Sequence, residues 1–209
     1  MKKIQIDDCI CHSKIKEHLE IRDSILSEIE KSSDGNLEQK DSFYTDSISK
    51  LDWDISDKLD RPWVKIFLPV FIKNLKEVID NLGYAKVVIQ NIWYQQYLEG
   101  DTHGWHIHDD HFTGVYYIEF PEGCSQTEII SPYDFKAVKI DASEGDFVVF
   151  PAHYIHRGLP NGSKRKTIIS YNFSADGSPI DGKCSLDTNK IKKVNPNISW
   201  WCNVTPPQN

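Results

Sequence analysis

The stretch "GWHIHDDHFTGVYYIEF", residues 104–120, decides the fold class of this chain. Three histidines and two aspartates fall within six positions, from His106 to His111, and an aromatic and β-branched run follows at once. Such residues are enriched in strands. Because successive side chains of a strand alternate between its faces, His106 and His108 point to the same side, where they can share one metal ion.

The strand-like pattern extends on both sides of this stretch, from Ala85 to about residue 174. Turn signals rich in Gly and Pro interrupt it at residues 99–101, 121–123, 144–146 and 160–162. We therefore expect six strands, at residues 85–97, 114–120, 127–130, 137–140, 146–150 and 166–173. Many short strands after N-terminal helices predict an α+β chain whose binding or catalytic part is a sandwich or barrel.

The residues before this region predict two helices. Apolar residues recur every three or four positions from Ile15 to Ile29, with Ser13 as a candidate N-cap, so we expect a helix of about 17 residues. A second helix is predicted from Pro69 to Gly83, because proline is tolerated in the first turn and glycine commonly ends a helix. Residues 32–60 predict an ordered but irregular connection.

We predict a single domain over residues 1–209. Residues 1–84 form a helical and irregular support, residues 85–174 form the core, and residues 175–209 form a tail. The tail contains the pair Trp200 and Trp201, which would be costly to leave exposed. We therefore expect the tail to pack on the core.

Composition argues against several classes of protein. The chain is 39% hydrophobic and 26% charged, which is ordinary for a globular domain, and its five cysteines are too scattered for a disulfide framework. No apolar run reaches the ~20 residues of a membrane helix, and the N-terminus lacks the apolar core of a signal peptide. We predict a cytoplasmic protein without a membrane partner. The net charge of −7 argues against general nucleic-acid binding.

Two later segments complete a candidate site. "GDFVVFPAHYIHRGLPNG", residues 145–162, brings His153 and His156 in from a buried strand, and "KRKTIISYNF", residues 164–173, opens the last strand with three cations. A mononuclear iron site takes ligands from one short segment, a further histidine from a distant strand, and open positions for substrate and oxygen. Histidine pairs on neighbouring strands can provide such a site.

Four segments, in this order and spacing, resemble the Fe(II)/2-oxoglutarate-dependent oxygenase superfamily: "YLEGDTHGWHIH", "FTGVYYIEFPEG", "EGDFVVFPAHYIHRGLPNG" and "RKTIISYNF". They are most similar to its 2OG-Fe(II) oxygenase branch with H-x-H-P and S-G-V-Y-Y patterns, met in bacteria and phages. The likeness covers residues 86–174. It implies a double-stranded β-helix (jelly-roll) core, Fe(II), 2-oxoglutarate as cosubstrate, O2, and hydroxylation of a substrate that the sequence does not identify.

The resemblance also implies a metal-binding triad. His106 matches the first iron ligand, and His156 matches the distal histidine. His108 occupies the second position, where most of the superfamily has a carboxylate. His108 also begins an H-x-D motif, so His108, Asp110 and His156 form the alternative triad, although the spacing from the preceding glycine favours His106.

For the cosubstrate, the resemblance implies a basic residue that pairs with the far carboxylate of 2-oxoglutarate. Lys166 matches it, and Arg165 is the rival, because strand alternation lets only one of the two point inward. Ser170 lies on the same face as Lys166. Asn91 and Trp93 share a face of the strand 85–97 and are further candidates for the cosubstrate pocket.

The remaining conspicuous residues have less specific interpretations. We expect His111 at the rim of the site and His153 to line the pocket or pack rather than ligate. Arg157 is equally consistent with a substrate anion and with a surface salt bridge. Two other functions fit the pattern: a cupin-like three-histidine dioxygenase without cosubstrate, and a non-catalytic jelly roll that binds a ligand or serves as a structural module. The oligomeric state is not readable from the sequence.

Overall fold

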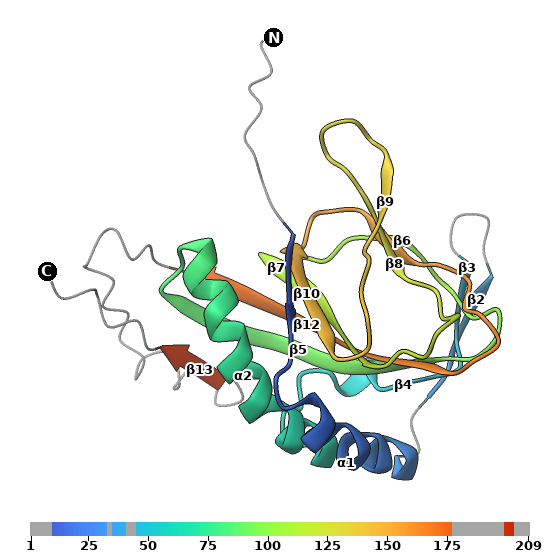
Figure 1. Cartoon of the computed structure of the whole chain (residues 1–209), viewed down its shortest axis with the longest axis horizontal. Coiled ribbons are helices and arrows are strands. Elements are labelled where there is room, and N and C mark those ends of the chain that lie inside the picture. The colour runs from blue at the N-terminus through green and yellow to red at the C-terminus, as the bar shows by residue number, and fades with distance from the viewer. Residues whose placement is uncertain (1–9, 33–34, 41–44, 177–198, 203–209) are drawn as a thin grey trace, which may run out of the picture.

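The computed structural model describes residues 10–32, 35–40, 45–176 and 199–202. Two antiparallel sheets face each other, and two helices cover the outer face of the larger sheet (Figure 1). The larger sheet has the order β1 (Cys11–Lys14), β10 (Asp146–Pro151), β7 (Phe112–Glu119), β12 (Lys166–Asp176), β5 (Lys86–Tyr97) and β13 (Ser199–Cys202), and β4 (Lys50–Leu51) also pairs with β5. The smaller sheet has the order β6 (His103–His106), β11 (His156–Gly158), β8 (Thr127–Ile130) and β9 (Ala137–Lys139).

This architecture confirms the predicted jelly-roll core with N-terminal helices. The expected strands all appear as β5, β7, β8, β9, β10 and β12, with ends shifted by at most three residues. Residue preferences did not indicate β1, β6, β11 and β13. Strands β6 and β11 have only four and three residues, rich in His and Gly, and are defined by their pairing with each other rather than by local propensity.

Both predicted helices start at the wrong residue. The first, α1, covers His18–Lys31, because Ser13 belongs to β1, where it pairs with Phe147. The second, α2, covers Pro62–Leu82, so that Pro69 lies inside it. Proline suits the first turn at either position, and the buried residues that follow Pro62 extend the apolar stripe by two turns. Gly83 ends α2 with a φ of 78°, as expected.

The alternation of side chains along the strands builds two separate cores. Tyr116, Ile169 and Tyr171 face the helices, and the Tyr171 ring lies 4.3 Å, centre to centre, from the ring of Phe71 in α2. The intervening residues face the smaller sheet: Val115, Tyr117, Val148, Phe150 and Ile168. The inner face of β12 therefore also carries its polar residues, among them Lys166, into the space between the sheets.

Gly114, in the middle of the opening stretch, permits this packing. A Cβ at this position would clash with the carbonyl oxygen of Val148 and come within 2.6 Å of the Tyr171 ring. The Tyr171 hydroxyl donates to that same carbonyl at 2.7 Å. Only glycine leaves room for the tyrosine to cross β7 and reach β10.

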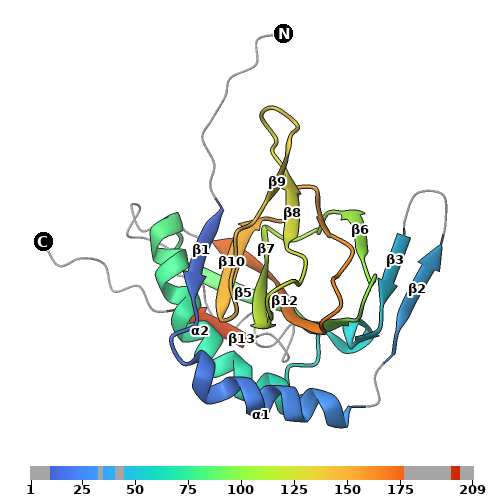
Figure 2. The same ribbon diagram turned by 45° about the vertical axis from the view of Figure 1, so that its right-hand side comes forward.

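The connection from residue 32 to residue 60 contains short elements that border the smaller sheet (Figure 2). A hairpin of β2 (Leu37–Lys40) and β3 (Thr45–Ile48) precedes the 3-10 helix η1 (Trp53–Ile55). Ser47 and Thr102 form a β-bridge, which holds β3 beside β6.

In the tail, β13 pairs with β5, whereas residues 177–198, residues 203–209 and the side chains of Trp200 and Trp201 lie outside the described part. No helix among the described residues is long and apolar enough to span a membrane.

Candidate metal centre

His106 and His156 meet because β6 and β11 pair directly at these two residues. Their ring centres lie 4.2 Å apart. Each imidazole uses Nδ1 to donate to a backbone carbonyl two residues earlier, His106 to Gly104 at 2.7 Å and His156 to Tyr154 at 2.8 Å. These contacts place the proton on Nδ1, so that both Nε2 atoms carry lone pairs available to a metal.

His108 approaches from the loop after β6. Its backbone N–H donates to the carbonyl of Ala152 at 2.9 Å, which ties the loop to the end of β10. Its Nε2 lies 3.3 Å from Nε2 of His156, and its Nδ1 lies 3.4 Å from Nδ2 of Asn172. One nitrogen from each of His106, His108 and His156 falls within 4.8 Å of the others. The structure thus brings together the three histidines of the first predicted triad.

Burial keeps this cluster neutral. Desolvation lowers the pKa of His106, lowers that of His108 to about 3, and lowers that of His156 well below its usual value. Neighbouring imidazoles lower the pKa of His108 and His156 further. Because a metal binds only the neutral form of histidine, the site is ready to bind a cation at neutral pH.

Asp110, His111 and His153 lie outside the cluster of three histidines. Asp110 accepts from Ser174 at 3.3 Å and is not part of the histidine cluster. His111 is exposed and contacts the backbone of Ala175 through Nδ1. His153 is also exposed and does not line the pocket; its ring packs against Tyr154.

Arg157 binds a protein carboxylate rather than facing a free anion. Its guanidinium donates to Glu128 at 2.7 Å and lies over the Trp105 ring, 4.2 Å from the ring centre. The surface salt bridge is therefore the alternative that the structure favours, although part of Arg157 reaches the wall of the inner cavity.

Lys166 points inward and Arg165 does not. Arg165 donates to Glu119 at 2.9 Å and also pairs with Glu30 on the outer side. Lys166 is only 3% exposed; its Nζ donates to the carbonyl of Ser125 at 3.1 Å and lies 4.1 Å from the centre of the Tyr97 ring. Burial lowers the pKa of Lys166 to about 8. Among the described residues it has no carboxylate partner.

Lys166 and the three histidines line one narrow inner cavity between the sheets, with a volume of about 30 Å³. Ser170 also lines it and donates to Gln95 at 3.4 Å. Asn91, in contrast, donates to Ser56 at 3.1 Å and is not among the lining residues.

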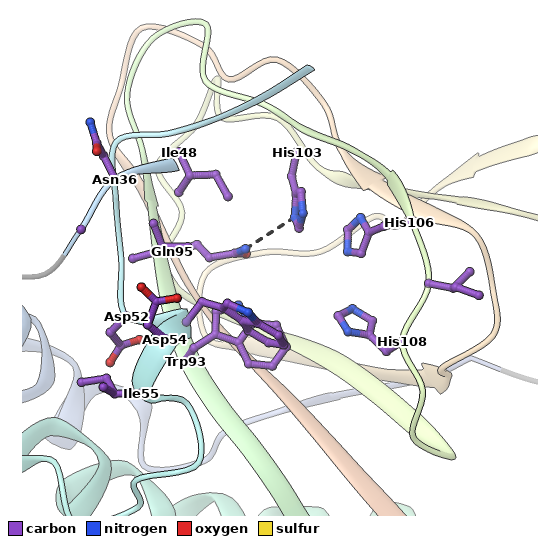
Figure 3. Close-up of a pocket in the computed structure, with 14 residues that line it drawn as sticks. Asn36, Ile48, Asp52, Asp54, Ile55, Trp93, Gln95, His103, His106 and His108 are labelled. Carbon is purple, nitrogen blue, oxygen red and sulfur yellow. Dashed lines mark hydrogen bonds between the residues drawn. The ribbon is translucent and has the colours of Figure 1, made fainter. Parts of the chain in front are cut away.

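A larger pocket of about 430 Å³ lies outside the inner cavity, and Figure 3 shows it between the histidines and the η1 segment. The two share five lining residues: Trp93, Gln95, His103, His106 and His108. Trp53 stands at the outer pocket with 43% of its surface exposed, its ring edge-to-face with that of Trp93. The imidazoles thus lie between a confined inner space and an open outer one.

Sequence reasoning missed His103 and Gln95. The rings of His103 and His106 stack with centres 3.8 Å apart, and Gln95 lies 3.5 Å from His103 (Figure 3). Strict alternation sends residues 103 and 106 to opposite faces, but the pairing of β6 with β11 is irregular between them. A bulge of this kind shifts the alternation by one residue, and the sequence carries no clear sign of it.

No family model matches the sequence, and neither does any curated protein. Solved structures do match the fold. An oxidoreductase of the 2OG-Fe(II) oxygenase family from Burkholderia pseudomallei has a TM-score of 0.58 at 12% identity, over 75% of this chain and 79% of that chain. A prolyl-4-hydroxylase from Pseudomonas putida has a TM-score of 0.56 at 15% identity, over 80% and 93%.

A third match is a prolyl hydroxylase from Trichoplax adhaerens, in complex with a peptide fragment of the hypoxia inducible factor oxygen degradation domain. It has a TM-score of 0.57 at 18% identity, over 79% of this chain and 83% of that chain. At these identities the likeness concerns the fold. The chain therefore has the double-stranded β-helix fold of the 2OG-Fe(II) oxygenases.

Proposed function

We propose that the protein is an Fe(II)- and 2-oxoglutarate-dependent dioxygenase, and specifically a hydroxylase of a substrate still to be identified. One observation carries the proposal. On this fold, three neutral imidazoles and a buried ammonium group without a carboxylate partner among the described residues line the same cavity.

Three imidazole nitrogens suit a divalent metal ion and would leave further positions open to ligands. Two nitrogens about 2.1 Å from one ion, at about a right angle, are about 3 Å apart. The 3.3 Å between Nε2 of His108 and Nε2 of His156 is close to this value. Three imidazoles leave the positive charge of Fe(II) uncompensated, and a chelating dianion such as 2-oxoglutarate would compensate it.

Lys166 fits the other end of the cosubstrate. A buried charge is costly unless it is paired, so this ammonium favours a ligand that brings a carboxylate into the inner cavity. That cavity, with room for about one water molecule, must widen by side-chain movement or extend into the outer pocket to hold 2-oxoglutarate. A cupin-like dioxygenase without cosubstrate gives no role to this lysine.

Each group then has a distinct task. His106, His108 and His156 would hold the iron, and Lys166 would orient 2-oxoglutarate. When bound, iron and 2-oxoglutarate supply the oxidation: O2, 2-oxoglutarate and a C–H bond of the substrate give succinate, CO2 and the hydroxylated product. The outer pocket, beside the histidines and open to the surface, would present the substrate. A neighbour of this fold is in complex with a peptide, which makes peptides a first class to screen.

Calorimetry on the metal-free protein tests whether the protein binds the metal and 2-oxoglutarate. We expect 2-oxoglutarate to bind only after Mn(II) or anaerobic Fe(II) has been added. We expect His156→Ala to abolish the binding of both the metal and 2-oxoglutarate. His153→Ala, three residues earlier and exposed, is the matched control and retains both. Oxygen uptake by the iron-loaded protein that is indifferent to 2-oxoglutarate would instead establish a cosubstrate-free dioxygenase. Metal binding unchanged in His156→Ala would remove the triad.

A further inference from the structure

Asn172 is a buried polar residue for which the proposed function has so far given no role. It lies on β12 with 3% of its surface exposed. Its Nδ2 lies 3.4 Å from Nδ1 of His108, and its Oδ1 has no hydrogen-bond partner in the part of the chain that the structure describes. Because a buried carbonyl without a partner is unfavourable, such an atom calls for an explanation.

The chemistry of His108 supplies one. A neutral imidazole carries one proton, so a metal on Nε2 requires that proton on Nδ1, where it needs an acceptor. Backbone carbonyls of Gly104 and Tyr154 serve His106 and His156 in this way. For His108, the Asn172 amide lies within reach of Nδ1.

The two tautomers of His108 require opposite orientations of that amide. With the proton on Nε2, His108 can donate to Nε2 of His156 at 3.3 Å and accept from Nδ2 of Asn172. With the proton on Nδ1, Nδ2 would face another N–H group, which is repulsive. Rotation of the amide by 180° exchanges its oxygen and nitrogen with almost no change of shape, and turns this contact into an N–H to oxygen hydrogen bond.

A bound metal would favour one of the two tautomers of His108, the one with its proton on Nδ1. A metal on Nε2 would withdraw electrons from the ring and strengthen the Nδ1–H group as a donor, so the contact to Oδ1 would be stronger than an ordinary neutral hydrogen bond. The rotation moves the amide nitrogen to the place that the unpartnered oxygen leaves. The rotated amide therefore still has one group without a partner among the described residues. The stronger hydrogen bond to His108 is what favours the rotated orientation.

We propose that Asn172 is a positioning residue that accepts the Nδ1–H of His108 and so directs Nε2 of that ring at the metal. This inference rests on the proposed metal centre and deepens it: the site needs a fourth side chain, on a different sheet from His106 and His156, to make the third imidazole competent.

Three variants test it, with binding of Zn(II) or Co(II) by competition titration as the readout. Asn172→Leu keeps the size and removes the acceptor; we expect its metal affinity to fall about 10- to 100-fold. Asn172→Asp supplies acceptors alone and is expected to bind the metal at least as tightly as the wild type. Asn74→Leu is the matched control: it removes another buried amide, which donates to Glu17 at 2.9 Å, and lowers stability but not metal affinity.

Nitrogen NMR of the histidine rings gives a second readout that needs no variant to fold. In the Zn(II)-loaded wild type, we expect the proton of His108 on Nδ1 and the metal on Nε2. Ligation through Nδ1, or wild-type affinity in Asn172→Leu, would overturn the role of Asn172 while leaving the triad intact. Failure of the triad shows differently, as metal binding that His156→Ala does not change.

Discussion

Replacement of Lys166 by methionine should weaken cosubstrate binding and stabilise the protein at the same time. Methionine has a similar length and is apolar. In the wild type, Lys166 is 3% exposed between the sheets, with the Ser125 carbonyl and the Tyr97 ring as its contacts. If Lys166 instead stabilised the fold, its replacement by methionine would lower the stability of the protein. Measurements of affinity and of stability together therefore distinguish a binding role from a structural role.

The stability gain follows from the pKa of Lys166, which burial lowers from 10.5 to about 8. At pH 7 the lysine is charged in both the folded and the unfolded chain, so this lowered pKa means that the fold bears a cost of about 3 kcal/mol. Methionine removes that cost but leaves the Ser125 carbonyl without its donor, which costs about 1–3 kcal/mol. We therefore expect a gain between zero and about 2 kcal/mol.

The loss of affinity follows from the missing ion pair. A hydrogen bond to a charged group contributes about 1.5–3 kcal/mol, so the dissociation constant of 2-oxoglutarate should rise about 10- to 150-fold. Calorimetry on the Mn(II)-loaded variant measures this, and urea denaturation of the metal-free variant measures stability. Arg165→Met, the preceding residue with its partners on the outer side, is the control and should leave 2-oxoglutarate affinity unchanged. A Lys166→Met protein with wild-type affinity would refute the reasoning.

Three further results are expected. The kcat/KM for 2-oxoglutarate should fall as the pH rises through about 8, where Lys166 loses its proton in the free enzyme, and a Lys166→Arg enzyme should lose this step in the pH profile. Gly114→Ala should destabilise the fold by about 3 kcal/mol in urea denaturation, since its methyl group overlaps neighbouring atoms. Asp52→Ala should lower the free energy of unfolding by about 3–5 kcal/mol, because it leaves the buried Arg61 without its carboxylate, whereas Asp54→Ala, on the exposed neighbour, should change it by less than about 0.5 kcal/mol.

The sequence was sufficient where one local pattern dominates. Strands β5, β7, β10 and β12 are mostly buried runs rich in apolar, β-branched and aromatic residues, so these four strands could be read directly, whereas the short strands β1, β4 and β13 of the same sheet could not. Helix ends were harder. Pro62 and Pro69 are equally good starting residues by themselves, and only the packing of the first turns against the sheet selects Pro62.

For the site, the resemblance of the four quoted segments to the oxygenase superfamily predicted His106, His108 and His156 as the candidate triad, with Asp110 as an alternative ligand. The structure brings the three histidines together, although His108 lies in the loop after β6 and not on the strand. Only the tertiary structure decided which other residues surround the three histidines. The choice between Lys166 and Arg165 depended on which face of β12 meets the smaller sheet, and His103 entered the pocket through a bulge between β6 and β11. Asn172 reached His108 only because the two sheets face each other. Contacts between residues far apart in the chain depend on register and sheet packing, which no local pattern encodes.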